Sequence, residues 1–174
     1  NYNKQYNRNY ICVVPVNLYG EYDNFSVNDG HVIPGLIHRM FNYKKNQKEL
    51  NINEKFKAYG TGKPLRQFLY AGDFAKIILN IMINYKPEPM NIKPIICCND
   101  EITIKELVNN IAYIMNINLQ NIEFDTDKLD GCMRKTVSNK YFNSIFPNFN
   151  YTSLYEGLEK TIKWFENNYE YLRK

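Results

Sequence analysis

Short apolar runs alternate along the chain with longer segments whose apolar residues recur at helical spacing. The runs over 10–16 and 94–98 are nearly continuous, as in strands buried on both faces of a parallel sheet. Pro15 is expected to end the first strand, because proline cannot donate to a strand ladder. Gly, Asp and Asn residues then indicate a loop over 17–30. Shorter strands are predicted at 56–59, 67–70 and 122–124.

Two helices are predicted between these strands. The first begins near Ile33, with Pro34 acceptable in its first turn, and passes into an exposed helix end and loop over 44–54. The second spans 74–85 and should bury one apolar face. Its face residues are Phe74, Ile77, Ile78, Ile81, Met82 and Tyr85, and the prolines expected to end it are Pro87 and Pro89.

Two further helices are indicated by capping-box spacing. Thr103 with Glu106, and Ser153 with Glu156, each precede an apolar helical stripe. A short helix is also predicted over 140–146. Strands that alternate with helices define an α/β fold, and no repeat or linker divides the 174 residues into separate units.

Composition and charge narrow the class of protein. The net charge of +4 is mild and the basic residues are scattered among acids, which disfavours a nucleic-acid binder. No apolar run is long enough to cross a bilayer. The four cysteines have neither zinc nor C-x-x-C spacing, so no metal site is predicted. Buried free thiols and a cytoplasmic location are expected, with Cys12, Cys97 and Cys98 lying in apolar runs.

Polar residues with possible chemistry cluster in the loops beside these elements. The segment 15–20 follows a buried strand, where ligands bind in open α/β sheets, although Asn and Gly also suit a plain turn. His31 stands at the start of a helix and Arg39 lies two turns along it. Imidazole is suited to moving protons. A capping His and a solvated Arg explain the same positions without any ligand.

Two more stretches could bind an anion. In 59–68 the fragment G-x-G-K lacks the P-loop spacing, whereas an aromatic before a Gly turn and a following Arg offer a stacking face and a phosphate clamp. The stretch 124–135 carries Asp130, Arg134 and Lys135. A surface charge cluster with an Asp-Gly turn is the alternative for this last stretch.

Five motifs in order resemble one family. They are PVNLYG (15–20), DNF (23–25), HVIPGLI-x-R (31–39), YGTGKPLRQFLYAGDFAK (59–76) and DGCMRK (130–135). This set is similar to the family of GDP-L-fucose synthases, NADPH-dependent epimerase-reductases of the extended short-chain dehydrogenase/reductase family. The resemblance covers essentially the whole chain. It implies remnant parallel strands of a Rossmann sheet and a GDP-sugar-binding portion over 1–174.

The resemblance also implies roles for individual residues. His31 matches the family's acid/base histidine, which lies beside the cofactor. The segment that touches the nicotinamide end of NADP(H) matches Pro15, Val16, Asn17 and Leu18, and Asn17 is also close to the sugar. Tyr59 stands where tryptophan is common. The residues that match GDP-sugar contacts are Asn17, Arg39, Tyr59, Arg66, Asp130 and Lys135.

Other family features have no match in the chain. Tyr2, Tyr6 and Tyr10 are not followed by Lys at the Tyr-x-x-x-Lys interval, and the Gly-rich phosphate turn and the catalytic cysteine and serine are not matched. We therefore expect a C-terminal portion, inactive alone, that begins near the end of the helix carrying Tyr and Lys, of an enzyme that is a homodimer. A related nucleotide-sugar epimerase or dehydratase, and a non-catalytic GDP-sugar-binding domain, are the alternatives.

Overall fold

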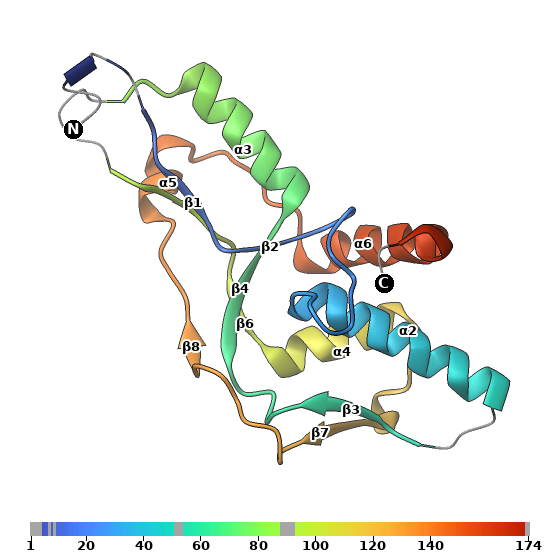
Figure 1. The fold of residues 1–174 in the computed structure, drawn as a ribbon. Helices are drawn as coiled ribbons and strands as arrows, with labels where there is room; N and C mark the ends of the chain where they lie inside the picture. The colour runs from blue at the N-terminus through green and yellow to red at the C-terminus, as the bar shows by residue number, and fades with distance from the viewer. Residues whose placement is uncertain (1–4, 7, 9, 51–53, 88–92, 173–174) are drawn as a thin grey trace.

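The computed structural model describes residues 5–6, 8, 10–50, 54–87 and 93–172. The expected helix end at Pro89, most of the opening helical tail and residues 51–53 of the predicted loop lie outside these ranges. Within them, strands alternate with helices along the chain (Figure 1), so the predicted α/β class is confirmed.

Parallel pairing dominates the strands. The bounds are β1 (Val13–Pro15), β2 (Asn17–Tyr19), β3 (Phe56–Tyr59), β4 (Leu65–Tyr70), β5 (Ile95–Cys97), β6 (Glu101–Thr103), β7 (Ile122–Asp125) and β8 (Arg134–Lys135). β1 pairs with β5, β2 with β4, and β3 with β7, all in parallel. β4 also holds β6 antiparallel and β8 parallel. β4 is therefore the strand on which the central sheet is assembled.

The extended run 13–19 changes partner halfway along. Val13 to Pro15 pair with β5, the Val16 N–H donates to the Cys97 carbonyl at 3.1 Å, and Asn17 to Tyr19 then pair with β4. The predicted loop 17–30 was therefore wrong in its first three residues. Residues 17–19 form a strand because β4 supplies their hydrogen-bond partners, and the local sequence does not predict this pairing.

Five helices of the described chain cover the strands. They are α2 (Val32–Leu50), α3 (Ala71–Asn84), α4 (Ile104–Ile114), α5 (Lys140–Ile145) and α6 (Leu154–Asn168). The full capping box at Thr103 is confirmed. At Ser153 the hydroxyl accepts from the Glu156 N–H at 3.2 Å, while the Glu156 carboxylate accepts from Lys160 at 2.7 Å. α2 runs to Leu50, within the stretch 44–54 in which the exposed helix end was expected.

Buried apolar side chains form two clusters that meet at β4. Helices α2, α4 and α6 supply most of the larger cluster, and α3, α5 and β5 supply most of the smaller one. Phe68 points into the larger cluster and Leu69 into the smaller one. Because successive strand side chains alternate between faces, one strand can serve both clusters.

Some burial expectations fail. Val14 is 43% exposed, so β1 is not buried on both faces, and Cys12 is exposed rather than buried. The neighbours Ile11 and Val13 face the smaller cluster. Because side chains alternate along an extended chain, Cys12 and Val14 point the other way. Met82 is also exposed, because it lies about 100° around α3 from the buried Ile81.

Candidate functional site

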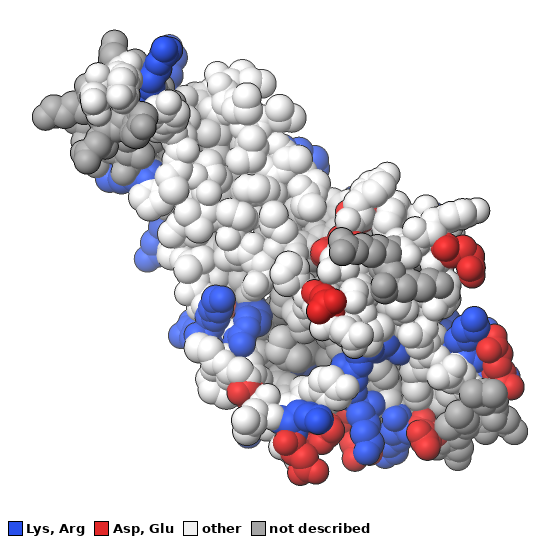
Figure 2. Space-filling view, in the orientation of Figure 1, with Lys and Arg blue, Asp and Glu red and all other residues white. Residues whose placement is uncertain are grey.

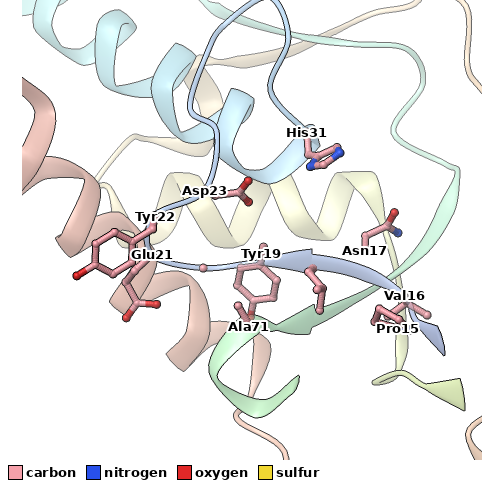
Figure 3. A pocket seen from close by; sticks show the side chains of 11 residues that line it. Pro15, Val16, Asn17, Tyr19, Glu21, Tyr22, Asp23, His31 and Ala71 are labelled. Carbon is pink, nitrogen blue, oxygen red and sulfur yellow. The ribbon is translucent and has the colours of Figure 1, made fainter. Parts of the chain in front are cut away.

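A cavity of about 490 Å³ opens at the carboxyl end of β2. Its wall includes the predicted cofactor segment Pro15, Val16, Asn17 and Leu18, together with His31. Figure 3 shows Asn17, Asp23 and His31 directed into the space between β2 and the start of α2. The structure therefore brings together all five residues predicted to lie near the cofactor, at the sheet edge where ligands bind in open α/β folds.

His31 is held by the first turn of α2. Its carbonyl accepts from the Gly35 N–H at 2.9 Å, and its side chain is exposed. The same residue lines a second cavity of about 210 Å³ with Arg39 and Tyr59. His31 therefore stands at the boundary of two cavities, which no single loop motif could indicate.

Arg39 and Tyr59 form one stacked unit. The Arg39 guanidinium carbon lies 4.0 Å from the centre of the Tyr59 ring, and its Nη2 donates to the Lys57 carbonyl at 2.5 Å. Phe56 borders the same guanidinium at 5.2 Å. Cation–π contact and the carbonyl bond fix the position of the arginine. Tyr59 as a whole residue remains 58% exposed.

Arg66 and Lys135 come together through strand pairing. β8 lies parallel to β4 with Lys135 opposite Arg66, and the Leu65 N–H donates to the Met133 carbonyl at 2.8 Å. The predicted surface loop at 134–135 is thus a short strand. In Figure 2, Lys and Arg gather over the lower half of the molecule, around β3, β7 and β8, where Asp and Glu also lie.

The Asp130 carboxylate already has protein partners. Its Oδ1 accepts from the Thr61 N–H at 2.9 Å and its Oδ2 from the Thr61 hydroxyl at 2.5 Å. These two hydrogen bonds, the side-chain one first, hold the pKa of Asp130 below its ordinary value. The contact joins residues that are 69 positions apart in the sequence, so the motif alone could not reveal it.

Asn17 is anchored to the neighbouring strand. Its Nδ2 donates to the Gln67 carbonyl at 2.9 Å. Gln67 is itself buried; its side chain donates to the Asn99 and Val137 carbonyls and accepts from the Val137 N–H at 2.7 Å. Gln67 had no predicted role. The signal available in the sequence was a polar residue inside a predicted strand, which indicates that the side chain has buried hydrogen-bond partners.

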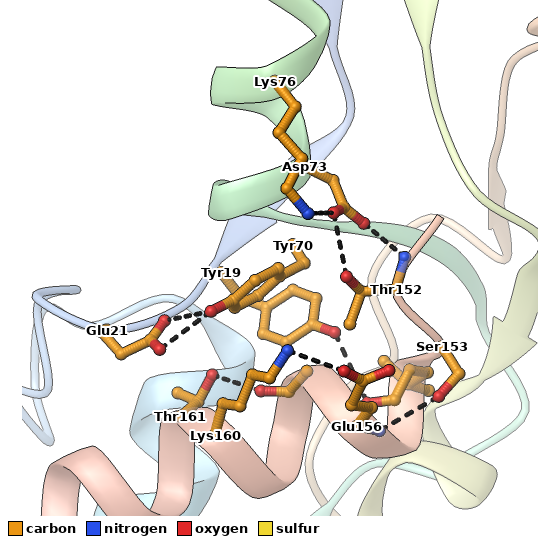
Figure 4. Close-up of polar contacts among 12 residues, drawn as sticks. Tyr19, Glu21, Tyr70, Asp73, Lys76, Thr152, Ser153, Glu156, Lys160 and Thr161 are labelled. Atoms are coloured by element: carbon orange, nitrogen blue, oxygen red, sulfur yellow. Dashed lines mark hydrogen bonds and ion pairs between the residues drawn. The ribbon is translucent and has the colours of Figure 1, made fainter. Parts of the chain in front are cut away.

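A polar network borders the first cavity on its β4 side (Figure 4). The Tyr70 hydroxyl donates to the Glu21 carboxylate, 2.8 Å from each oxygen. Burial, followed by this hydrogen bond, raises the pKa of Tyr70 to about 12. Burial and the nearby Asp73 raise the pKa of Tyr19. Glu21 and Tyr70 meet because the parallel register aligns the ends of β2 and β4.

Two absences concern only the described part of the chain. No three His, Cys, Asp or Glu side chains gather there in a way that could hold a metal ion. None of the helices described in it is long and apolar enough to span a membrane. The cysteines among these residues are free thiols, and Cys97 and Cys98 are buried as expected.

An α/β fold with cavities at the carboxyl ends of its parallel strands is typical of nucleotide-binding proteins. The model of the NAD dependent epimerase/dehydratase family matches residues 1–92, more than half of the 174. The chain belongs to this family.

Relatives of named function narrow the comparison. The chain is 39% identical to a GDP-L-fucose synthase of Dictyostelium discoideum and 36% identical to a probable one of Drosophila melanogaster, over 99% of its own length in each case. These alignments cover 52% and 54% of the two relatives, so the chain spans about half the length of the curated relatives it matches.

A solved structure gives the same picture. A GDP-L-fucose synthetase from Naegleria fowleri bound to NADP aligns with a TM-score of 0.82 and 41% identity. The alignment covers 94% of this chain and 49% of that one. The expected fold, the α/β fold of the extended short-chain dehydrogenases, is therefore confirmed.

Proposed function

We propose that the chain forms the GDP-sugar-binding part of an NADPH-dependent enzyme that converts GDP-4-keto-6-deoxy-D-mannose to GDP-L-fucose. The observation that carries this proposal is the position of His31. It lines both the cavity bounded by Pro15 to Leu18 and the cavity bounded by Arg39 and Tyr59. A proton-transferring group is needed where the cofactor end and the sugar meet.

His31 would move protons at the sugar carbons beside the ketone. A carbonyl at C4 acidifies the hydrogens at C3 and C5, so an acid/base pair can invert each centre: one group removes the proton from one face and the other delivers a proton to the opposite face. Imidazole accepts and releases protons near neutral pH. The exposed side chain of His31, at the mouth of α2, is accessible to such a substrate.

The first cavity fits the nicotinamide end of NADP(H). Pro15, Val16 and Leu18 offer an apolar wall, while Asn17 and His31 offer polar groups at its edge. When bound, the cofactor supplies the hydride that reduces C4. Asn17 is held rigidly by its bond to the Gln67 carbonyl, which suits a residue that orients both cofactor and sugar.

A diphosphate would be held by cations from three elements. Arg39 comes from α2, Arg66 from β4 and Lys135 from β8, and guanidinium groups bind phosphate oxygens in forked pairs. Tyr59 adds an exposed aromatic face for the nucleotide. Compared with the tryptophan common in the family, it keeps the ring face and lacks the indole N–H.

The similar proteins support this assignment. Two relatives that match 99% of the chain carry the name GDP-L-fucose synthase. One is from D. discoideum, at 39% identity, and the other is from Escherichia coli, at 32% identity. The similar N. fowleri synthetase holds NADP in its crystal structure.

GDP binding tests the proposed diphosphate site. Arg66→Gln should weaken GDP binding roughly tenfold or more in isothermal titration calorimetry, because a charge-assisted phosphate contact is lost. Lys163→Gln removes an equal charge from an exposed position on α6 and should leave the affinity unchanged. Equal affinities of the wild type and Arg66→Gln would refute the role of Arg66.

Solvent deuterium exchange tests His31. In the full-length enzyme, His31→Asn should slow exchange at C3 and C5 of GDP-4-keto-6-deoxymannose by about 10²-fold or more, the typical loss for a general base. GDP affinity should change far less, because the imidazole does not contact the nucleotide in this proposal. Unchanged exchange in the variant would show that another group moves the protons.

A further inference from the structure

The turn between β3 and β4 is hydrogen-bonded to the end of β7. Gly60 donates its N–H to the Asp125 carbonyl at 2.9 Å, which extends the β3–β7 ladder by one step. Gly60 and Gly62 have φ values of +79° and +73°, which glycine adopts readily. A Cβ atom at Gly62 would lie 2.6 Å from the Phe124 ring. The turn therefore has little room to move against β7.

Asp130 closes the same turn from its other side. Thr61 offers its N–H and its hydroxyl to the two carboxylate oxygens, and the same hydroxyl accepts from the Lys63 N–H at 3.2 Å. A Cβ atom at Gly60 would clash with Asp130 Oδ1. The carboxylate is thus packed against the turn as well as hydrogen-bonded to it.

The residues on both sides of this contact are those assigned to the GDP-sugar. Tyr59 directly precedes the turn and Arg66 follows it, while Gly131 directly follows Asp130. An added Cβ at Gly131 would lie 3.5 Å from the Arg66 guanidinium, so the two segments lie close together there. A shift of Asp130 would therefore displace both the aromatic ring of Tyr59 and the guanidinium of Arg66.

We propose that Asp130 is a positioning residue for the GDP-sugar site: its carboxylate holds the turn of residues 60–63 through Thr61, and so sets where Tyr59 and Arg66 stand. This assignment replaces a direct bond from Asp130 to the ligand. It rests on the proposed function, because Tyr59 and Arg66 matter only if they bind a nucleotide.

A double-mutant cycle with GDP separates the two roles of Asp130. Thr61→Val keeps the shape of Thr61 and removes its hydroxyl, and Asp130→Asn removes the charge. Each variant of the full chain should weaken GDP binding roughly tenfold, the effect of losing one charge-assisted hydrogen bond. The double variant should be no weaker than the stronger single effect, because both changes break the same contact. Thr61→Ser, which restores the hydroxyl, should recover most of the affinity.

Matched controls come from the same loop. Thr126→Val and Asp127→Asn change exposed residues and should leave GDP affinity unchanged. Wild-type affinity in Thr61→Val, together with weak binding by Asp130→Asn, would overturn the proposal in favour of direct ligand contact. Additive losses in the double variant would overturn it as well.

Hydrogen exchange tests the contact without any ligand. The Thr61 and Lys63 amides should exchange roughly tenfold faster in Asp130→Asn than in the wild type. If the wild type fails to bind GDP, the proposed function falls, and unchanged exchange at these amides would separately overturn the contact. Urea midpoints close to that of the wild type would show that the variants are folded.

Discussion

Tyr70 illustrates how one side chain couples a cavity wall to the protein's stability. Its ring is partly buried and lies 5.6 Å from the Lys160 ammonium, and its hydroxyl donates to Glu21, which lines the larger cavity. A hydrogen bond to a charged acceptor is worth more than a neutral one. Tyr70 therefore fixes the orientation of Glu21 at the cavity edge.

Alkaline pH should weaken the protein through Tyr70. Its pKa is about 12, against about 10 for an unfolded tyrosine, so between these values only the unfolded chain releases the proton. The stability that Tyr70 contributes is complete below pH 10 and is lost as the pH rises towards 12. In urea titrations, Tyr70→Phe should lower the free energy of unfolding by about 1 kcal/mol at pH 7. Between pH 10 and pH 12, the free energy of unfolding of Tyr70→Phe should decline less steeply than that of the wild type.

Tyr171→Phe is the control for this measurement. Tyr171 is 90% exposed, so its hydroxyl should contribute little to stability at pH 7. A pH dependence that is identical in the wild type and Tyr70→Phe would contradict the link between Tyr70 and alkaline unfolding.

Single residues near the site were only partly predictable from the sequence. His31, Arg39 and Tyr59 stood out because their types suit proton transfer, phosphate binding and stacking, and the structure places them around one cavity. The partner of Asp130 did not stand out, since Thr61 lies 69 positions away. A motif shows which side chains are available, and the fold decides which of their atoms are already engaged.

At the level of elements, local signals were reliable where the hydrogen bonds are local. The Thr103 capping box and the apolar stripe behind it define α4 within a few residues. β6 and β8 were missed, because strands of three and two residues are too short to show an alternating pattern. These segments are strands because β4 offers them an edge on which to pair.

Asp73 joins α3 to the segment that enters α6, 79 positions along the sequence. Its side chain is 1% exposed and accepts from the Thr152 N–H at 2.5 Å, the Thr152 hydroxyl at 2.9 Å and Lys76 at 3.2 Å. Asp73→Ala should lower the free energy of unfolding by about 2 kcal/mol, because the half-buried N–H and hydroxyl of Thr152 lose their acceptor. Urea denaturation measures this loss of the link between α3 and the chain entering α6.

The matched control is Asp100→Ala, which removes an exposed carboxylate from the loop after β5. Its unfolding free energy should stay within about 0.5 kcal/mol of the wild type. If both aspartate variants lost equal stability, the contact between Asp73 and Thr152 would carry no special weight.

For the whole molecule, the two apolar clusters were foreseeable but their connection was not. Helical stripes in the sequence predict Ile37, Leu107 and Leu158 as core residues, and all three lie in the larger cluster. The switch of the run 13–19 from β5 to β4 depends on pairing between distant strands. That switch places the predicted cofactor segment at the cavity, so the site was harder to foresee than the core.

The reactivity of the cysteine thiols measures how well the smaller cluster excludes solvent. Cys97 and Cys98 are buried beside β4 and α5, while Cys12 and Cys132 are exposed. Burial, followed by the neighbouring Cys98, raises the pKa of Cys97 to about 12, so its reactive thiolate is scarce near neutral pH. Cys12 and Cys132 should react with Ellman's reagent at once. The two buried thiols should react at least about a thousandfold more slowly, because they depend on opening of the fold.

This labelling pattern tests the packing of the whole chain, since β5 holds β1 on one side and its side chains fill the smaller cluster. In urea all four thiols should react promptly. The double variant Cys12→Ser and Cys132→Ser should lose the fast phase and keep the slow one, which assigns each phase to its residues. Four fast thiols in the native protein would mean that the smaller cluster is open in solution. A slow phase that accelerates with urea in step with global unfolding would show that both clusters open as one cooperative unit, as expected when β4 contributes to each.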